Sequence, residues 1–183
     1  MKPTRFTLAL MVAALGVAAA GTIKAPPRTD PEIGARVAHE VRMYSWYSVW
    51  DNVEIRVANA SVELLGVVNQ PFKKTDLGRI VARVPGVAGV TNSLRVLPLS
   101  TMDDRLRLQV ATAIYFQPAL QRYALTPLPP IHIIVENGRV TLEGVVSSAM
   151  DKQIAGMTAS SAGLSFGQVV NNLRVENPSP KKS

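Results

Sequence analysis

Residues 133–146 read IIVENGRVTLEGVV, and this stretch decides the fold of the chain. Apolar and polar residues alternate on both sides of Asn137-Gly138, as they do in two strands that each bury one face. Asn-Gly is the favoured pair for a two-residue type I′ turn, because both central residues need a positive φ angle. The stretch therefore predicts a β-hairpin.

An earlier stretch repeats this pattern. Residues 55–68 read IRVANASVELLGVV, so Asn59-Ala60 takes the place of the turn and Gly66 matches Gly144. An alanine at positive φ costs roughly 1 kcal/mol, so we expect a looser turn at Ala60. A glycine inside a strand indicates a bulge or a close backbone approach, which we attribute to a helix packed tightly over the sheet.

Further repeated segments flank each hairpin in the same order. A helical apolar pattern that opens near an aspartate precedes it, and a second helical pattern and a strand of the form Val-x-Asn-x-Leu-x-Val follow it. We expect Thr29 or Asp30 to cap the first helix of the first copy, and Thr101 or Asp103 that of the second. The paired apolar positions are Ile33, Val37 and Val41 with Leu106, Val110 and Ile114 in the first helix, and Leu77, Ile80 and Val81 with Ile154, Met157 and Thr158 in the second.

Each copy therefore reads helix, strand, strand, helix, strand. The fold class is α+β, with two tandem αββαβ modules, each a small three-stranded mixed sheet covered on one face by two helices. The first domain spans residues 30–97 and the second 103–176, and the short apolar linker between them indicates that the two units touch. Residues 21–29 are predicted to be a flexible lead-in and residues 177–183 a disordered tail.

The N-terminus has the features of an export signal. Lys2 and Arg5 provide a positive start, and the uncharged run over residues 6–20 is shorter than the roughly 20 residues that a helix needs to span a bilayer. Three alanines at its end fit the small-x-small cleavage pattern, so we predict a signal peptide cleaved after Ala20. Cleavage after Ala25, an uncleaved anchor and a buried helix are the alternatives. We expect a periplasmic or cell-envelope protein.

Composition limits the chemistry and the partners. The formal net charge of +7 favours contact with anionic surfaces such as lipid headgroups, cell-wall polymers or nucleic acid, and export would separate the protein from nucleic acid. The chain has no cysteine, which excludes disulfides and lipid attachment at a cysteine. His39 and His132 do not stand at the spacing of metal ligands, and no phosphate-binding or nucleophile motif occurs. We therefore expect no enzymatic activity, catalytic residue, cofactor or metal site.

The repeated motifs resemble a known family. A helix that opens with Asp, the pattern V-x-N-G-x-V-T-L-x-G-x-V and the final V-x-N-x-L-x-V are similar to the BON domain, which is typical of osmotically inducible periplasmic proteins. The resemblance covers both copies, and the first departs from the pattern at Ala60. It implies a binding or stress-protective role at anionic phospholipid or other envelope components, and no reaction.

Two aromatic segments are candidate binding surfaces. The first, at the end of the first predicted helix, suits a membrane interface, and the alternative is packing in the core or between modules. In the second, arginines beside aromatic rings suit a lipid headgroup, and the alternative is a solvated helix face with core aromatics. Lys73-Lys74 is predicted to be a surface pair. The candidate lipid- or partner-binding residues are Trp46, Tyr47 and Trp50 in the first segment, and Arg105, Arg107, Tyr115, Phe116 and Arg122 in the second.

These observations predict docking on an anionic phospholipid membrane. The alternative is a periplasmic adaptor or chaperone-like module that binds an envelope protein or a cell-wall partner.

Overall fold

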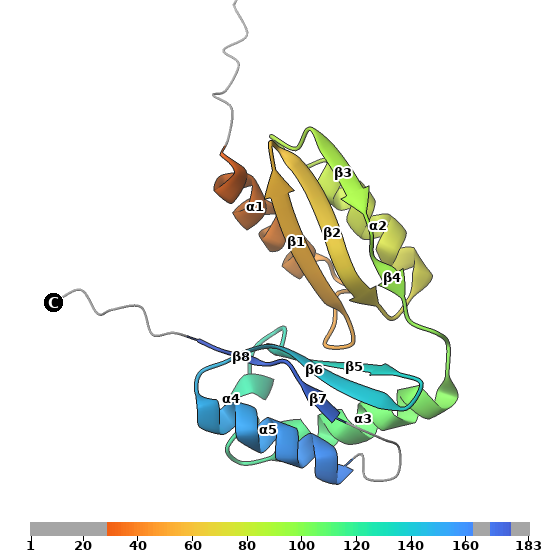
Figure 1. Cartoon of the computed structure of the whole chain (residues 1–183), viewed down its shortest axis with the longest axis vertical. Coiled ribbons are helices and arrows are strands. Elements are labelled where there is room, and N and C mark those ends of the chain that lie inside the picture. Colours follow the sequence, from red (N-terminus) through yellow and green to blue (C-terminus); the bar gives the residue numbers. More distant parts are fainter. Residues whose placement is uncertain (1–28, 163–168, 177–183) are drawn as a thin grey trace, which may run out of the picture.

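The computed structural model describes residues 29–162 and 169–176 and shows two α+β units joined by a short linker (Figure 1). The predicted signal peptide, the C-terminal tail and nearly all of the lead-in lie outside the described residues. Among those described, no helix is long and apolar enough to cross a membrane. The first unit consists of α1 (Asp30–Met43), β1 (Asn52–Ala58), β2 (Ser61–Val68), α2 (Pro71–Ala82), β3 (Gly89–Asn92) and β4 (Arg95–Val96). The second consists of α3 (Thr101–Phe116), α4 (Gln121–Ala124), β5 (Ile131–Glu136), β6 (Arg139–Val146), α5 (Ala149–Ala162), β7 (Val169–Asn171) and β8 (Arg174–Val175).

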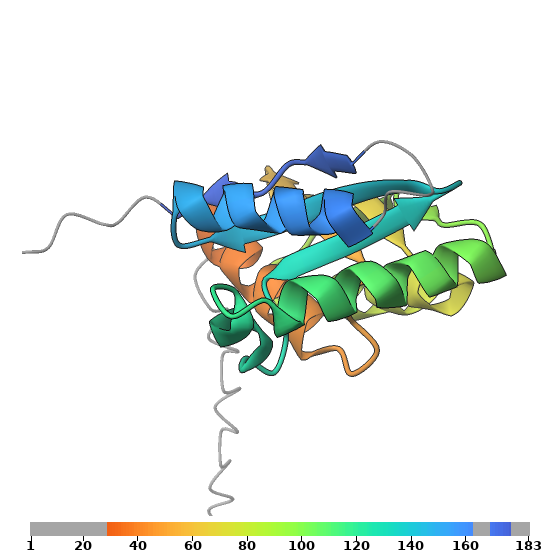
Figure 2. The ribbon, with the colours of Figure 1, turned by 90° about the horizontal axis from the view of Figure 1, so that it is seen from below.

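Each unit has the predicted mixed sheet with two long helices on one face (Figures 1 and 2). Strands β1 and β2 pair antiparallel, and β3 and β4 both pair parallel with β2. The predicted third strand is therefore present in two short pieces, and β7 and β8 repeat this arrangement on β6. The short helix α4 lies in the connection between the first helix and the hairpin of the second unit.

An asparagine at the break between the two pieces of the third strand bonds to the second helix. In the first unit, Asn92 Nδ2 donates to Lys74 O at 2.7 Å, and its Oδ1 accepts from Leu94 N at 3.3 Å. Gly78 permits this contact, because a Cβ there would lie 2.8 Å from Asn92 Nδ2. Asn171 makes the same two bonds in the second unit.

The two hairpin turns have the same conformation. Asn59 and Ala60 have φ angles of 51° and 61°, and Asn137 and Gly138 have φ angles of 52° and 76°. The predicted looser turn at Ala60 is therefore wrong. The reason is the carboxylate of Asp30, which accepts the amides of Asn59 and Ala60 at 2.8 Å each and offsets the strain of a left-handed alanine.

The second module ties its turn in the same way. Asp103 accepts the amides of Asn137 and Gly138 at 2.9 and 2.8 Å. The cap of α3 is Ser100, whose hydroxyl accepts from Asp103 N at 3.2 Å, so the prediction of Thr101 or Asp103 is wrong. In the first module the predicted Thr29 is the N-cap of α1.

Both strand glycines mark a close backbone approach, as predicted, but its source is a strand. Gly66 and Gly144 have φ angles of 101° and 116°. A Cβ would lie 2.2 Å from Asn52 O at the first and 1.9 Å from Pro130 O at the second. The attribution to a tightly packed helix is therefore wrong, because the contact comes from the start of the neighbouring strand, at Asn52 in β1 and at Pro130 directly before β5.

The pairing of the second helices is also corrected. Helix α2 buries Lys73, Leu77 and Val81, whereas α5 buries Asp151, Ala155 and Ala159. These positions match when the two helices are aligned one residue away from the predicted pairing, and Met157 is consequently exposed. Two alanines contribute so little apolar surface that the larger Ile154 and Met157 dominated the sequence pattern.

Candidate functional site

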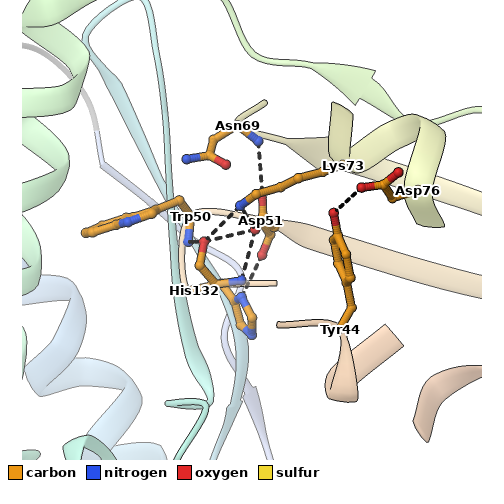
Figure 3. Close-up of polar contacts among 8 residues, drawn as sticks. Tyr44, Trp50, Asp51, Asn69, Lys73, Asp76 and His132 are labelled. Carbon is orange, nitrogen blue, oxygen red and sulfur yellow. Dashed lines mark hydrogen bonds and ion pairs between the residues drawn. The ribbon is translucent and has the colours of Figure 1, made fainter. Parts of the chain in front are cut away.

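The segment between α1 and β1, residues 44–51, packs on the second module. Ile133 N donates to Val49 O at 2.7 Å, and His132 Nδ1 lies 2.6 Å from the carbonyl oxygen of Asp51 (Figure 3). The Tyr47 ring lies 5.7 Å from the His132 ring, and Trp50 packs against the core of the second module. For Tyr47 and Trp50, the structure therefore corresponds to the alternative of packing between modules.

A buried ion pair anchors this segment to α2. Lys73 Nζ lies 2.6 Å from Asp51 Oδ2, and both side chains are buried (Figure 3). Asp51 also accepts hydrogen bonds from the amide and hydroxyl of Ser48 and from the amide of Asn69. The prediction that Lys73 is a surface residue is wrong, because the loop before β1 folds over it and supplies a carboxylate.

Apolar and polar contacts complete the joint. Val67 of β2, Leu97 of the linker and Ile134 of β5 form a small buried cluster, so the two units touch, as the apolar linker predicted. Arg95 pairs with Glu136 at 2.9 Å across the same boundary. Burial lowers the pKa of His132, although the Asp51 carbonyl opposes this shift. The joint is a packed interface whose burial favours the neutral form of His132.

The other candidate segment forms a surface at the far end of α3. Phe116 and Leu125 are 74% and 84% exposed, and the exposed Arg122 lies between them in sequence. With Tyr115 and three neighbours they line a shallow cleft of about 520 Å³. Tyr115 is half-buried and donates its hydroxyl to Ile131 O. The structure therefore brings Tyr115, Phe116 and Arg122 together.

The partners of Arg122 hold its side chain in place through only part of its guanidinium group. Its Nη2 pairs with Asp151 and lies 3.3 Å from the Tyr123 hydroxyl, and these contacts engage only one of its nitrogens among the described residues. Burial alone would raise the pKa of Asp151, but hydrogen bonds from Ser148 and Tyr123 and the charge of Arg122 hold that pKa below its ordinary value. Its other guanidinium donors make no hydrogen bond to the part of the chain that the structure describes.

Arg105 and Arg107 lie in different environments. Arg107 is buried, donates to Val135 O at 2.6 Å and pairs with Asp104, so it supports the fold and does not reach the surface. Arg105 is exposed and stands about three turns before Phe116 on the same face of α3. Arg105 therefore remains a candidate for surface binding and Arg107 does not.

Trp46 is the one member of the first aromatic segment that reaches solvent substantially. Its side chain is 64% exposed, and its ring packs edge-to-face on Phe72, with the ring centroids 5.8 Å apart. No sequence pattern predicted that Phe72 belongs to this surface, because it stands alone at the start of α2. No group of three or more His, Cys, Asp or Glu side chains within the described ranges could hold a metal ion.

The fold and the joint define a protein of two tandem αββαβ modules that pack on one another. The family model of the BON domain matches residues 29–98 and 103–177, one match on each module. The chain therefore belongs to the BON domain family.

Other comparisons add little detail. No curated protein sequence matches the chain. Among solved structures, the C-terminal domain of CdsD, the structural protein of the type III secretion system of Chlamydia trachomatis, is 14% identical with a TM-score of 0.30. That match covers 76% of this chain and 62% of the CdsD chain. A second CdsD structure is 12% identical, with a TM-score of 0.27, and the match covers 77% of this chain and 93% of that one.

Proposed function

We propose that the protein is a non-enzymatic binding protein that docks on anionic phospholipid at a membrane surface of the cell envelope. The observation that carries this proposal is the surface at the end of the second module, where Phe116 and Leu125 are exposed on either side of Arg122. We call these three residues, with Tyr115, the second-module surface. Exposed apolar side chains beside a guanidinium match the two parts of a lipid interface, the acyl boundary and the phosphate.

The expected energies favour such docking. Burial of a phenylalanine or leucine side chain contributes roughly 1.5–3 kcal/mol, and each basic residue near an anionic leaflet adds about 1 kcal/mol. Arg122 keeps free donors for phosphate, and Arg105 extends the basic character along α3. Residues 21–183 keep a basic excess once Lys2 and Arg5 are left out of the net charge of +7. This excess and membership of the BON family, which the resemblance associates with anionic phospholipid, support the same ligand.

Co-sedimentation with vesicles tests the proposal. Residues 21–183 are mixed with neutral vesicles or with phosphatidylglycerol-rich vesicles, at low and high salt. We expect binding to the anionic vesicles alone, weakened by salt because the electrostatic part is screened. Binding to neither kind of vesicle would contradict the proposal and favour the alternative, an adaptor that binds an envelope protein or a cell-wall partner.

Variants of exposed residues assign the binding surface. The double substitution Phe116→Ser and Leu125→Ser should weaken vesicle binding without changing the fold, since both side chains point to solvent. Leu99→Ser is the matched control, because Leu99 is 80% exposed but lies in the linker. Arg105→Glu should weaken binding further. Equal losses in the Leu99 control and the double variant would remove the assignment to the second-module surface.

A further inference from the structure

The two modules expose apolar side chains at equivalent places. Met43 and Phe116 are the last residues of α1 and α3, and they are 67% and 74% exposed. Phe72 and Met150 are the second residues of α2 and α5, and they are 44% and 63% exposed. Neither pair packs into a core. The repeat therefore places exposed apolar groups at the same end of both modules.

The connection after the first helix adds one more exposed apolar group to each set. Trp46 in the first module is 64% exposed, and Leu125 in the second is 84% exposed. In the first module the ring of Trp46 is seated on Phe72. We call Met43, Trp46 and Phe72 the first-module patch.

A hydrogen bond fixes the two helices that carry Met43 and Phe72 of the first-module patch, and an exposed arginine stands beside Met43. The Tyr44 hydroxyl donates to Asp76 Oδ2 at 2.7 Å and fixes the end of α1 against α2 (Figure 3). Asp76 is also paired with Arg79, so its charge is engaged. Arg42, the residue before Met43, is exposed in the last turn of α1. The patch thus has an aromatic pair beside Arg42, for which no ion pair occurs among the described residues, whereas the arginine of the second-module surface is paired with Asp151.

The segments that carry Trp46 and Leu125 lie toward one side of the protein. The connection that follows α1 and the short helix α4 both project from the lower edge of the view in Figure 2. The joint described above holds the two modules in this arrangement through buried contacts on His132, Ile134 and Asp51. A membrane on that side would therefore face both segments without a change in the packing of the modules.

We propose that the first-module patch is a second docking surface for anionic phospholipid, so that both modules bind one membrane at the same time. This inference rests on the proposed function of the second-module surface. Once one module is bound, attachment of the other is intramolecular, which multiplies the two affinities. Trp46 is the side chain that enters the interface, where tryptophan is favoured.

Trp46 is also a reporter of its own position. The chain has two tryptophans, so Trp50→Phe leaves Trp46 as the sole one and Trp46→Phe leaves Trp50. Each protein is titrated with phosphatidylglycerol-rich vesicles, with and without brominated acyl chains, and the emission is recorded alongside co-sedimentation. We expect a blue shift and bromine quenching for Trp46, and neither for Trp50, which packs on the second core. If Trp50→Phe disturbs the fold, the difference between the wild-type protein and Trp46→Phe gives the same information.

The outcomes separate the two proposals. Blue-shifted and quenched emission from Trp46, together with a loss of apparent affinity of at least about tenfold in Trp46→Ser with Phe72→Ser, would support bivalent docking. Co-sedimentation with unchanged Trp46 emission would overturn the first-module patch and leave the second-module surface intact. Absence of co-sedimentation would overturn the proposed function, and this inference with it.

Discussion

Strands β1 and β5 occupy the same place in two copies of one unit, yet their outer faces differ. Along β1 the outward side chains Glu54 and Arg56 are exposed, whereas His132 and Ile134 at the equivalent positions of β5 are buried. The first module covers the outer face of β5. The repeat therefore determines the face of each sheet that packs beneath the helices, and the joint between the modules uses the opposite face of β5.

A second difference concerns the ion pair that links the second helix to the connection before the hairpin. In the first module the helix supplies Lys73 and the connection supplies Asp51, while in the second the helix supplies Asp151 and the connection Arg122. The place is the same and the charges are exchanged. The fold therefore needs the link and not its polarity. The first pair is buried at the joint, but Arg122 remains 55% exposed.

The largest expected effect comes from breaking the buried pair. Lys73→Met should lower the free energy of unfolding by about 3–5 kcal/mol, because it leaves the carboxylate of Asp51 buried without a cation. Arg122→Met should cost clearly less, since the Arg122 side chain is 55% exposed and its charge is already screened by solvent, although Asp151 is buried. Chemical denaturation measures both, with Lys74→Met as the control on the same helix. Equal losses for Lys73 and Arg122 would contradict the comparison.

Substitution of the strand glycines tests whether the two hairpins have the same backbone constraint. Gly66→Ala and Gly144→Ala should each cost about 2 kcal/mol or more, because both residues have positive φ and a Cβ would meet a backbone oxygen. Gly89→Ala is the control, since its nearest contact would be Ser61 Oγ at 3.9 Å. Thermal and chemical unfolding give the values. A cost at only one of the two glycines would show that the two hairpins are built differently.

The turns offer a smaller and reciprocal test. Ala60→Gly should stabilise the first module by about 0.5–1 kcal/mol, because glycine adopts the positive φ of 61° without strain. Gly138→Ala should destabilise the second module by a similar amount. Unfolding measurements on both variants check the signs. Destabilisation by Ala60→Gly would mean that the packing of the alanine methyl group outweighs the strain of its backbone.

The smallest expected effect is a pH dependence of the free energy of unfolding, which comes from His132 of β5. Burial lowers the pKa of His132, so the folded protein prefers the neutral ring and the unfolded chain takes up the proton first. Stability is therefore full above the ordinary value of 6.5 and falls as the pH drops below it. His132→Gln should remove this part of the pH profile, and Glu54→Gln, at the equivalent exposed position, should not. An unchanged profile in His132→Gln would contradict the prediction.

Local patterns were sufficient to predict the modules. The alternation on either side of Asn137-Gly138 and its copy around Asn59-Ala60 predicted the hairpins, and the repeat order predicted the α+β units. The predictions that were wrong concern residues whose conformation or burial depends on a contact with a residue far away in sequence. Ala60 takes the tight turn because Asp30, far away in sequence, bonds it.

The candidate site was only partly predictable for the same reason. Tyr115, Phe116 and Arg122 are close in sequence and meet in the structure. Lys73 resembles a surface residue until Asp51 is folded over it. One overlooked signal was within the hairpin itself, since Ile134 interrupts the alternation of β5 where β1 has Arg56. An apolar residue in a polar position of a repeat indicates that another surface covers it.

The hydrogen bond between Ile133 N and Val49 O has a consequence for synthesis of the chain. Strand β5 pairs with β6 on one edge, and this bond occupies an amide on its other edge. Uncovered strand edges recruit strands from other chains and start aggregates. The segment that covers this edge, residues 44–51, is synthesised before β5, and N-terminal domains fold first. The free edge of β5 can therefore be covered as soon as the strand forms. The second module expressed alone would lack this cover, and we expect it to self-associate more than the two-module chain does.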